Sequence, residues 1–321
     1  QLKALAIAAA RAAREKTNAS ASEQSVAHAQ LTRLLADASG VRENFDVLSW
    51  RAGDLTRYAS EAGSPRRTSL QNNFNAALEA VIKNSQSTHA DRLAAMVGKI
   101  RLAALDAPEV KAGETSAAPK YPAALVAQAR DVVKAADTQT NDRMTRQATM
   151  SVAAFVLREV GLLDESDALL KAEVAKAIAP HYFLSDLSEN AKKRGDKAAA
   201  IAYAQQAYEK GEGPATRLQW GGLYVRVLLA DAPQDTARIV AATKSVLGDA
   251  QAAPDAFYER SLRSLERVGT ALDQWASTDA RRAALATLRT DLDRICEKIP
   301  SNDPAAASCR NAFRPKAKSA G

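Results

Sequence analysis

The sequence predicts an all-α protein built as a solenoid-like stack of helical hairpins, and three observations support this class. Apolar residues recur at spacings of three and four along nearly the whole chain, which is the helical period, and alternating strand-like runs are missing. Alanine supplies roughly 70 of the 321 residues, far above its ordinary usage, while aromatic residues make up only 5%. The 14 glycines and 11 prolines are sparse and fall between the periodic segments, as expected at helix boundaries.

The first 106 residues are expected to form an N-terminal helical segment. Residues 1–16 are too charged for the apolar core of a signal peptide, and we expect them to be helical. Ser20 and Glu23 form a capping box that begins the next helix, and Gly40 is its expected C-terminal stop. A later helix is expected to begin near residue 45 and to end at Gly63–Ser64–Pro65, and two more are expected in residues 69–84 and 88–104.

Residues 107–121 interrupt the helical pattern with small residues, prolines and charges. This composition is typical of a linker or a long loop, so we expect a boundary between two domains there. Pro122 then opens a new helix at the position that proline tolerates best. The expected domains are therefore residues 1–106 and 122–321.

Helices after the linker are expected to come in pairs. Gly161 and Gly195 each end a helix, and each is followed by a helix in which alanines recur every three or four residues. Small side chains at that spacing let neighbouring helices approach closely. The segment from Leu184 to Ala207 resembles one tetratricopeptide repeat, with Leu184 where that repeat prefers Trp and Ser188 where it prefers Gly. Further helices are expected in residues 218–229, 236–247, 257–275 and 280–296.

The charge distribution argues against a nucleic-acid partner. Forty-four Lys and Arg against 37 Asp and Glu give a net charge of +7. A nucleic-acid-binding protein would gather such an excess on one stripe, whereas here opposite signs alternate, as in residues 260–267. We therefore expect this stretch to be a solvated helix surface, and the basic cluster from Arg310 to Lys318 to be a frayed tail. No membrane span is expected either, because no run reaches the ~18 uncharged apolar residues that one needs.

The two cysteines, Cys296 and Cys309, lie close together in the sequence. Pro300 stops the helix that carries Cys296, and Asp303–Pro304 are expected to begin a short returning helix. This arrangement lets the two Cβ atoms meet, so a disulfide is the leading prediction, and it favours an oxidising compartment. Two buried free thiols and a redox-active pair are the alternatives, although the Cys-x-x-Cys spacing of redox sites is missing.

Residues 191–239, together with residues 257–267 and the paired-cysteine ending, resemble the helical C-terminal region of certain proteobacterial thioredoxin-family proteins. In that family, a thioredoxin fold with a Cys-x-x-Cys motif precedes a long helical region. The resemblance implies an exported, periplasmic protein, and residues 1–16 would be the tail of a preceding domain. Since the chain has no Cys-x-x-Cys, none of the family's redox residues can be assigned to a position in it.

No catalytic residue, metal site or cofactor is expected in this chain. The three histidines, His28, His89 and His181, have no second His or Cys at the spacing of a metal site. No motif for nucleophilic catalysis or phosphate binding occurs either. His181 follows Pro180 and precedes Tyr182–Phe183, an aromatic group that we expect to pack at a helix junction.

Two adjacent glycines, Gly221 and Gly222, lie inside a predicted helix. Each costs about 1 kcal/mol relative to alanine, so another feature should compensate for them. Close packing against another helix is the ordinary explanation, and a groove that receives a partner peptide is the functional one. The concave face of stacked repeats is their usual binding surface. The residues expected to bind a partner there are Tyr203, Arg217, Trp220 and Tyr224.

These patterns together predict a non-catalytic helical module that binds a protein or peptide partner as a scaffold. The resemblance links it to a periplasmic thioredoxin-like system. The alternative is a thiol–disulfide exchange partner that uses Cys296 and Cys309. A third class, an enzyme with a pocket between helices, has no residue in the sequence to support it.

Overall fold

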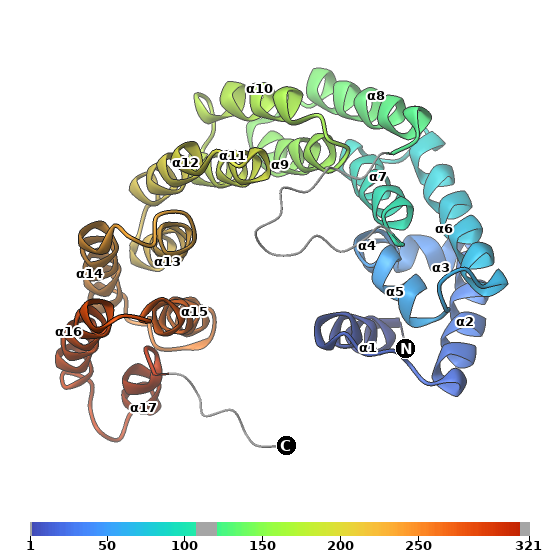
Figure 1. Ribbon diagram of the computed structural model, residues 1–321. Coiled ribbons are helices and arrows are strands. Elements are labelled where there is room, and N and C mark those ends of the chain that lie inside the picture. The colour runs from blue at the N-terminus through green and yellow to red at the C-terminus, as the bar shows by residue number, and fades with distance from the viewer. Residues whose placement is uncertain (1, 107–120, 315–321) are drawn as a thin grey trace. The chain divides into compact units, whose positions relative to one another are not determined.

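The computed structural model describes residues 2–106 and 121–314. These residues form seventeen helices and no strand, which confirms the all-α prediction (Figure 1). The chain divides into two compact units, Gln1–Leu169 and Leu170–Gly321, and the division falls inside helix α10 (Leu163–Val174).

Five helices of the first unit pack against α7. Three of them, α4, α5 and α6, precede α7 in the sequence, and the other two, α8 and α9, follow it. Besides the beginning of α10, the unit contains α1 (Leu2–Glu15), α2 (Ala21–Leu35), α3 (Ala38–Glu43), α4 (Phe45–Trp50), α5 (Ala52–Tyr58), α6 (Pro65–Lys83), α7 (His89–Ala103), α8 (Ala123–Gln139) and α9 (Arg143–Glu159).

The segment expected to separate two domains, residues 107–121, lies outside the described residues except for Tyr121. Because α7 packs against both α8 and α9, the helices on either side of that segment belong to the same compact unit.

Local capping explains where several helices begin. The expected capping box of Ser20 with Glu23 is present at α2, and Thr88 forms another with Asp91 at α7. Gly40 was predicted as a helix stop, and that prediction is wrong. Helix α2 ends at Leu35, and Gly40 lies within the short helix α3. Asp37 caps α3, because its side-chain carboxylate accepts a hydrogen bond from the Ser39 N–H.

The single helix expected from residue 45 to Gly63–Ser64–Pro65 is also interrupted, and its second part already ends at Tyr58. Arg51 has φ −120° and ψ 12°, which are not helical values, and so separates α4 from α5. The periodic pattern of apolar residues continues across this break, with Leu48 and Leu55 both buried in the same core. A one-residue break therefore leaves the buried face intact.

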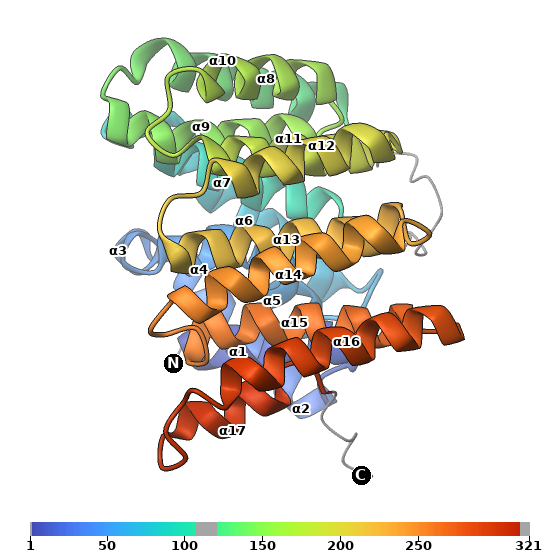
Figure 2. The ribbon, with the colours of Figure 1, turned by 90° about the vertical axis from the view of Figure 1, so that its left-hand side faces the viewer.

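The second unit stacks its helices in two layers. Helix α13 packs against α15 in one layer, and α14 packs against α16 in the other. Figure 2 shows these helices succeeding one another along the stack. The unit contains the end of α10 followed by α11 (Pro180–Arg194), α12 (Lys197–Glu209), α13 (Pro214–Asp231), α14 (Thr236–Ala252), α15 (Glu259–Trp275), α16 (Asp279–Cys296) and α17 (Pro304–Asn311).

Helices α11 and α12 form a tight hairpin. Gly195 ends α11 in the left-handed conformation, with φ 76°, which glycine adopts without the steric cost of a side chain. The buried Ser188 hydroxyl donates a hydrogen bond of 2.8 Å to the Ala200 carbonyl of α12. Ala204 and Ala207 are fully buried, so the alanine spacing places small side chains inside the hairpin, as predicted.

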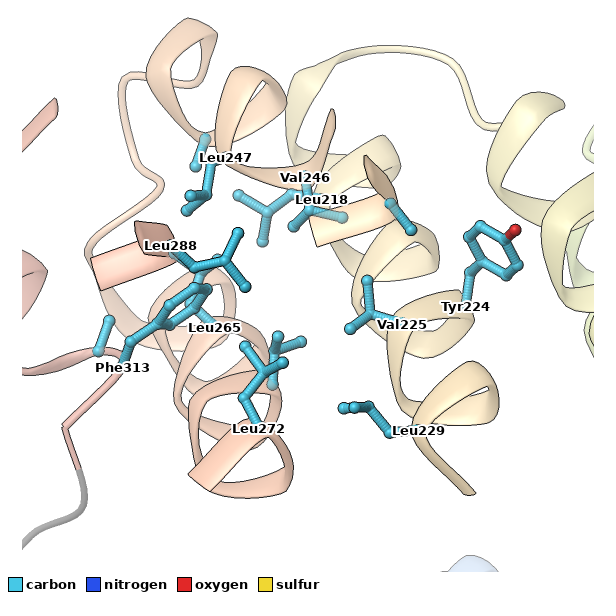
Figure 3. Packing of buried hydrophobic residues seen from close by; sticks show 14 of the residues in the cluster. Leu218, Tyr224, Val225, Leu229, Val246, Leu247, Leu265, Leu272, Leu288 and Phe313 are labelled. Carbon is cyan, nitrogen blue, oxygen red and sulfur yellow. The ribbon is translucent and has the colours of Figure 1, made fainter. Parts of the chain in front are cut away.

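The core of the second unit lies between the two layers. Figure 3 shows leucine and valine side chains from α13, α14, α15 and α16 facing one another across the core, with Phe313 at one side of the cluster beside Leu265 and Leu288. Complete burial of one such side chain contributes roughly 1.5–3 kcal/mol. The labelled members are Leu218, Tyr224, Val225, Leu229, Val246, Leu247, Leu265, Leu272, Leu288 and Phe313.

Candidate functional site

Cys296 and Cys309 form a disulfide, as predicted, between the last residue of α16 and the short helix α17. Asp303 caps α17 and Pro304 is its first residue, so the chain reverses direction in the expected place. The two Cα atoms are 5.7 Å apart. Both cysteines are buried, with exposures of 1% and 0%, so the sulfur atoms are shielded from an attacking thiolate.

The four residues predicted to bind a partner lie on two neighbouring helices, α12 and α13. Tyr203 is on α12 and is half-buried against the core. Arg217, Trp220 and Tyr224 follow one another at spacings of three and four on α13, and so share one side of that helix. The structure therefore brings Arg217, Trp220 and Tyr224 together on α13, and the four side chains have different surroundings.

Arg217 is engaged within the unit. Its Nε donates to Asp249 at 2.9 Å, and its guanidinium lies 4.6 Å from the ring centre of Tyr208. The Tyr208 hydroxyl also donates to Asp249. Burial and the neighbouring Asp249 carboxylate raise the pKa of Tyr208 well above its usual range, so the phenol keeps its proton. Arg217 thus joins α13 to α14 through a charged hydrogen bond.

Tyr224 is also directed into the unit, with 6% exposure. Its hydroxyl accepts a hydrogen bond of 2.8 Å from the Nε of Arg238, and Arg238 donates a second bond of 2.7 Å to Gln205. Polar groups buried in this way contribute to stability because each has a partner. Tyr224 therefore connects α12, α13 and α14 rather than presenting its ring to solvent.

Trp220 packs against His181 and Tyr182, whereas the sequence grouped those two residues with Phe183 and did not connect them to Trp220. Its ring centre lies 5.3 Å from those of both His181 and Tyr182, at the N-terminal end of α11. We call His181, Tyr182 and Trp220 the aromatic cluster. Tyr182 is 46% exposed, whereas the next residue, Phe183, is fully buried. The expected packing at a helix junction is thus confirmed for Phe183, and Tyr182 is the member that reaches solvent.

The surroundings of His181 favour the uncharged form of its imidazole. Burial lowers the pKa of its imidazole, while the Lys210 backbone carbonyl and the Glu212 carboxylate oppose the shift. Within the part of the chain that the structure describes, its Nδ1 is buried without a hydrogen-bond partner. A neutral ring of this kind adds to the apolar surface beside Tyr182 and Trp220.

The two glycines of α13 are explained by close packing of the helix on both sides. A Cβ atom at Gly221 would lie 2.6 Å from Val246 and 2.9 Å from the Tyr208 ring. A Cβ atom at Gly222 would lie 2.8 Å from the Ser264 hydroxyl of α15. Neither glycine therefore forms a groove, and the contacts that they permit offset their cost in a helix.

Two further observations concern the described residues only. They contain no group of three or more His, Cys, Asp or Glu side chains placed to hold a metal ion. None of their helices combines the length and apolar character that crossing a bilayer requires.

Comparison with protein-family models, with curated proteins and with solved structures finds no match for this chain. Fold and site together define an all-α protein of stacked helical hairpins whose candidate site is an aromatic cluster with one exposed member, Tyr182.

Proposed function

We propose that this protein is a non-catalytic interaction module that binds a protein or peptide partner through the aromatic cluster. The single observation that carries the proposal is the exposure of Tyr182 beside two packed aromatic rings. Tyrosine and tryptophan dominate the energetics of protein interfaces because they bury a large rigid area. Tyr203, which is half-buried on the adjoining helix α12, remains a further proposed contact of the partner.

We further propose that the module belongs to a periplasmic thiol–disulfide system. The resemblance of residues 191–239 to thioredoxin-family C-terminal regions and the tetratricopeptide-like hairpin α11–α12 support this proposal. An oxidising compartment suits a chain whose two cysteines pair locally. The burial of both sulfurs favours a structural disulfide over the alternative role in thiol exchange, because exchange needs an accessible sulfur.

The test is affinity capture from a proteobacterial periplasmic extract, with the immobilised wild-type chain and Tyr182→Ser compared side by side. We expect a defined partner to be retained by the wild type and lost from the variant. The matched control is Tyr258→Ser, which removes another exposed tyrosine, 41% exposed, from the same unit. Equal retention by the wild type and Tyr182→Ser would refute the aromatic cluster as the binding surface.

Redox titration of the disulfide distinguishes the proposed function from the alternative, which is a role in thiol–disulfide exchange. A reduction potential below about −300 mV identifies a structural cross-link, whereas a value near about −200 mV identifies an exchange pair. Free thiols should be undetectable with and without denaturant before reduction. A potential in the exchange range would replace the proposed function with the thiol–disulfide role.

A further inference from the structure

An open hollow of about 420 Å³ lies between α13 and α15 in the second unit, apart from the aromatic cluster. Its lining carries three arginines on two helices and one acid. The sequence predicted residues 260–267 to be an ordinary solvated surface of mixed charge, but that pattern omits Arg226, which the tertiary structure adds from α13. The lining residues are Arg226, Arg263, Glu266, Arg267, Thr270, Ala271 and Gln274.

The close approach of the two helices brings these like charges together. Gly222 meets Ser264 at the contact between α13 and α15. Arg226 follows Gly222 by one helical turn, while Arg263 and Arg267 lie on either side of Ser264 along α15. Residues three and four apart share a helix face, so Arg226 and Arg267 project beside the same contact.

Arg226 forms no ion pair there with any residue that the structure describes. It is half-buried, and its recorded hydrogen bond runs from Nε to the Gly222 carbonyl at 3.3 Å. Burial lowers the pKa of its guanidinium and Arg267 lowers it further, while Glu189 opposes the shift. The group nevertheless stays charged, because arginine does not lose its proton in proteins.

None of Arg226, Arg263 and Arg267 forms an ion pair with another described residue, whereas many arginines elsewhere in the described chain do. Glu189, the acid that acts on Arg226, is itself paired with Lys192 at 2.8 Å. Placing like charges together and partly removing one from water is unfavourable unless an anion binds. The cluster is therefore suited to receive negative charge from outside the chain.

We propose that this hollow binds an acidic peptide segment, with its carboxylates on Arg226, Arg263 and Arg267. Arginine pairs with carboxylates through two parallel hydrogen bonds, which gives direction as well as charge. The hollow is larger than one carboxylate requires. Thr270 and Gln274 supply polar groups for the peptide backbone, and Ala271 leaves room for it.

The lining favours a peptide over a nucleic acid. It contains no aromatic ring on which a base could stack. Glu266 would repel a continuous phosphate backbone, whereas separate carboxylates on a peptide can avoid it. The site shares no residue with the aromatic cluster, so its test is independent of the proposed function.

The experiment measures fluorescence anisotropy of labelled hexaglutamate with the full chain at about 0.15 M salt. Hexaglutamine and a single-stranded oligothymidylate serve as the neutral and nucleic-acid probes. We expect saturable binding of hexaglutamate alone. Arg263→Gln and Arg267→Gln should each weaken it by about tenfold, since each removes a charged hydrogen-bond donor. Both side chains are exposed, so both variants should keep the wild-type circular dichroism and melting temperature.

The matched control is Arg260→Gln, which removes the same charge from an exposed position of α15 outside the hollow. We expect it to leave the affinity within about twofold of the wild type, because screening weakens a charge at a distance. An equal loss in Arg260→Gln and Arg267→Gln would overturn the site, as it would mean attraction by net charge alone. Unchanged affinity in an Arg263→Gln/Arg267→Gln double variant, or tighter binding of oligothymidylate, would also overturn it.

Discussion

Replacing Gly269 of α15 with alanine should destabilise the second unit because the added methyl group has no space. A Cβ atom there would lie 2.3 Å from the Ala312 carbonyl oxygen and 2.7 Å from the Phe313 Cα atom. These are backbone atoms of the segment that follows α17. That segment is held by the buried Phe313 side chain and by a 2.9 Å hydrogen bond from Arg289 to the Phe313 carbonyl. It therefore cannot move away without losing contacts.

The expected cost follows from two opposing effects. Overpacking of this kind costs roughly 1–3 kcal/mol, and displacing Phe313 instead would forfeit about as much in burial. The higher helix propensity of alanine returns about 1 kcal/mol. Because the overlap is with backbone atoms, we expect a cost at the upper end of the overpacking range. The free energy of unfolding should therefore fall by about 2 kcal/mol, and the melting temperature by roughly 4–8 °C.

The control for this prediction is Gly248→Ala in α14, where a Cβ atom would have no neighbour within 4 Å. There the higher helix propensity of alanine acts without a steric cost, and it should stabilise the protein by about 0.5–1 kcal/mol. Scanning calorimetry of both variants beside the wild type measures the two effects. A Gly269→Ala variant that melts at or above the wild-type temperature would refute the packing argument.

Two further predictions concern cross-links between helices. Reducing the Cys296–Cys309 disulfide, which closes a loop with a sequence separation of 13, should lower the free energy of unfolding by about 3 kcal/mol in urea titrations. A Cys296→Ser/Cys309→Ser variant, in which dithiothreitol should change nothing, is the control. In the first unit, hydrogen bonds from Lys99 and other neighbours lower the pKa of Glu79 to about 2. The ionised form thus stabilises the fold above pH ~4.5, by about 1 kcal/mol after solvent screening, and this contribution disappears as the pH falls towards 2. The stability difference between the wild type and Glu79→Gln should narrow over that range; a constant difference would contradict the assignment.

Helix boundaries in this protein were predictable wherever one short segment contains the whole cause. The capping box of Ser20 and Glu23 and the left-handed Gly195 depend on atoms within a turn or two of the chain. The errors at Gly40 and at Arg51 have a shared origin. A glycine in the sequence does not reveal that a neighbouring side chain, here that of Asp37, caps a new helix around it. A helical pattern of apolar residues likewise does not reveal that the backbone leaves the helical conformation at a single residue, here Arg51.

The candidate sites were only partly predictable. The sequence spacing placed Arg217, Trp220 and Tyr224 on one side of a helix, and the structure agrees. It could not indicate that Arg217 and Tyr224 are used inside the unit, since their partners Asp249 and Arg238 are on the next helix along. The run from Pro180 to Phe183 did signal an aromatic junction, but not which ring reaches solvent.

By itself, the sequence determined that this chain is helical, where most of its helices end, and that its two cysteines can pair. Such features follow from backbone geometry and side-chain size over short distances, which residue order specifies directly. Tertiary structure alone decided that Arg226 lies beside Arg267 and that Tyr182 is exposed next to Trp220. Those neighbours are some forty residues apart in the chain, and they meet because small side chains, such as Gly222, let whole helices approach closely.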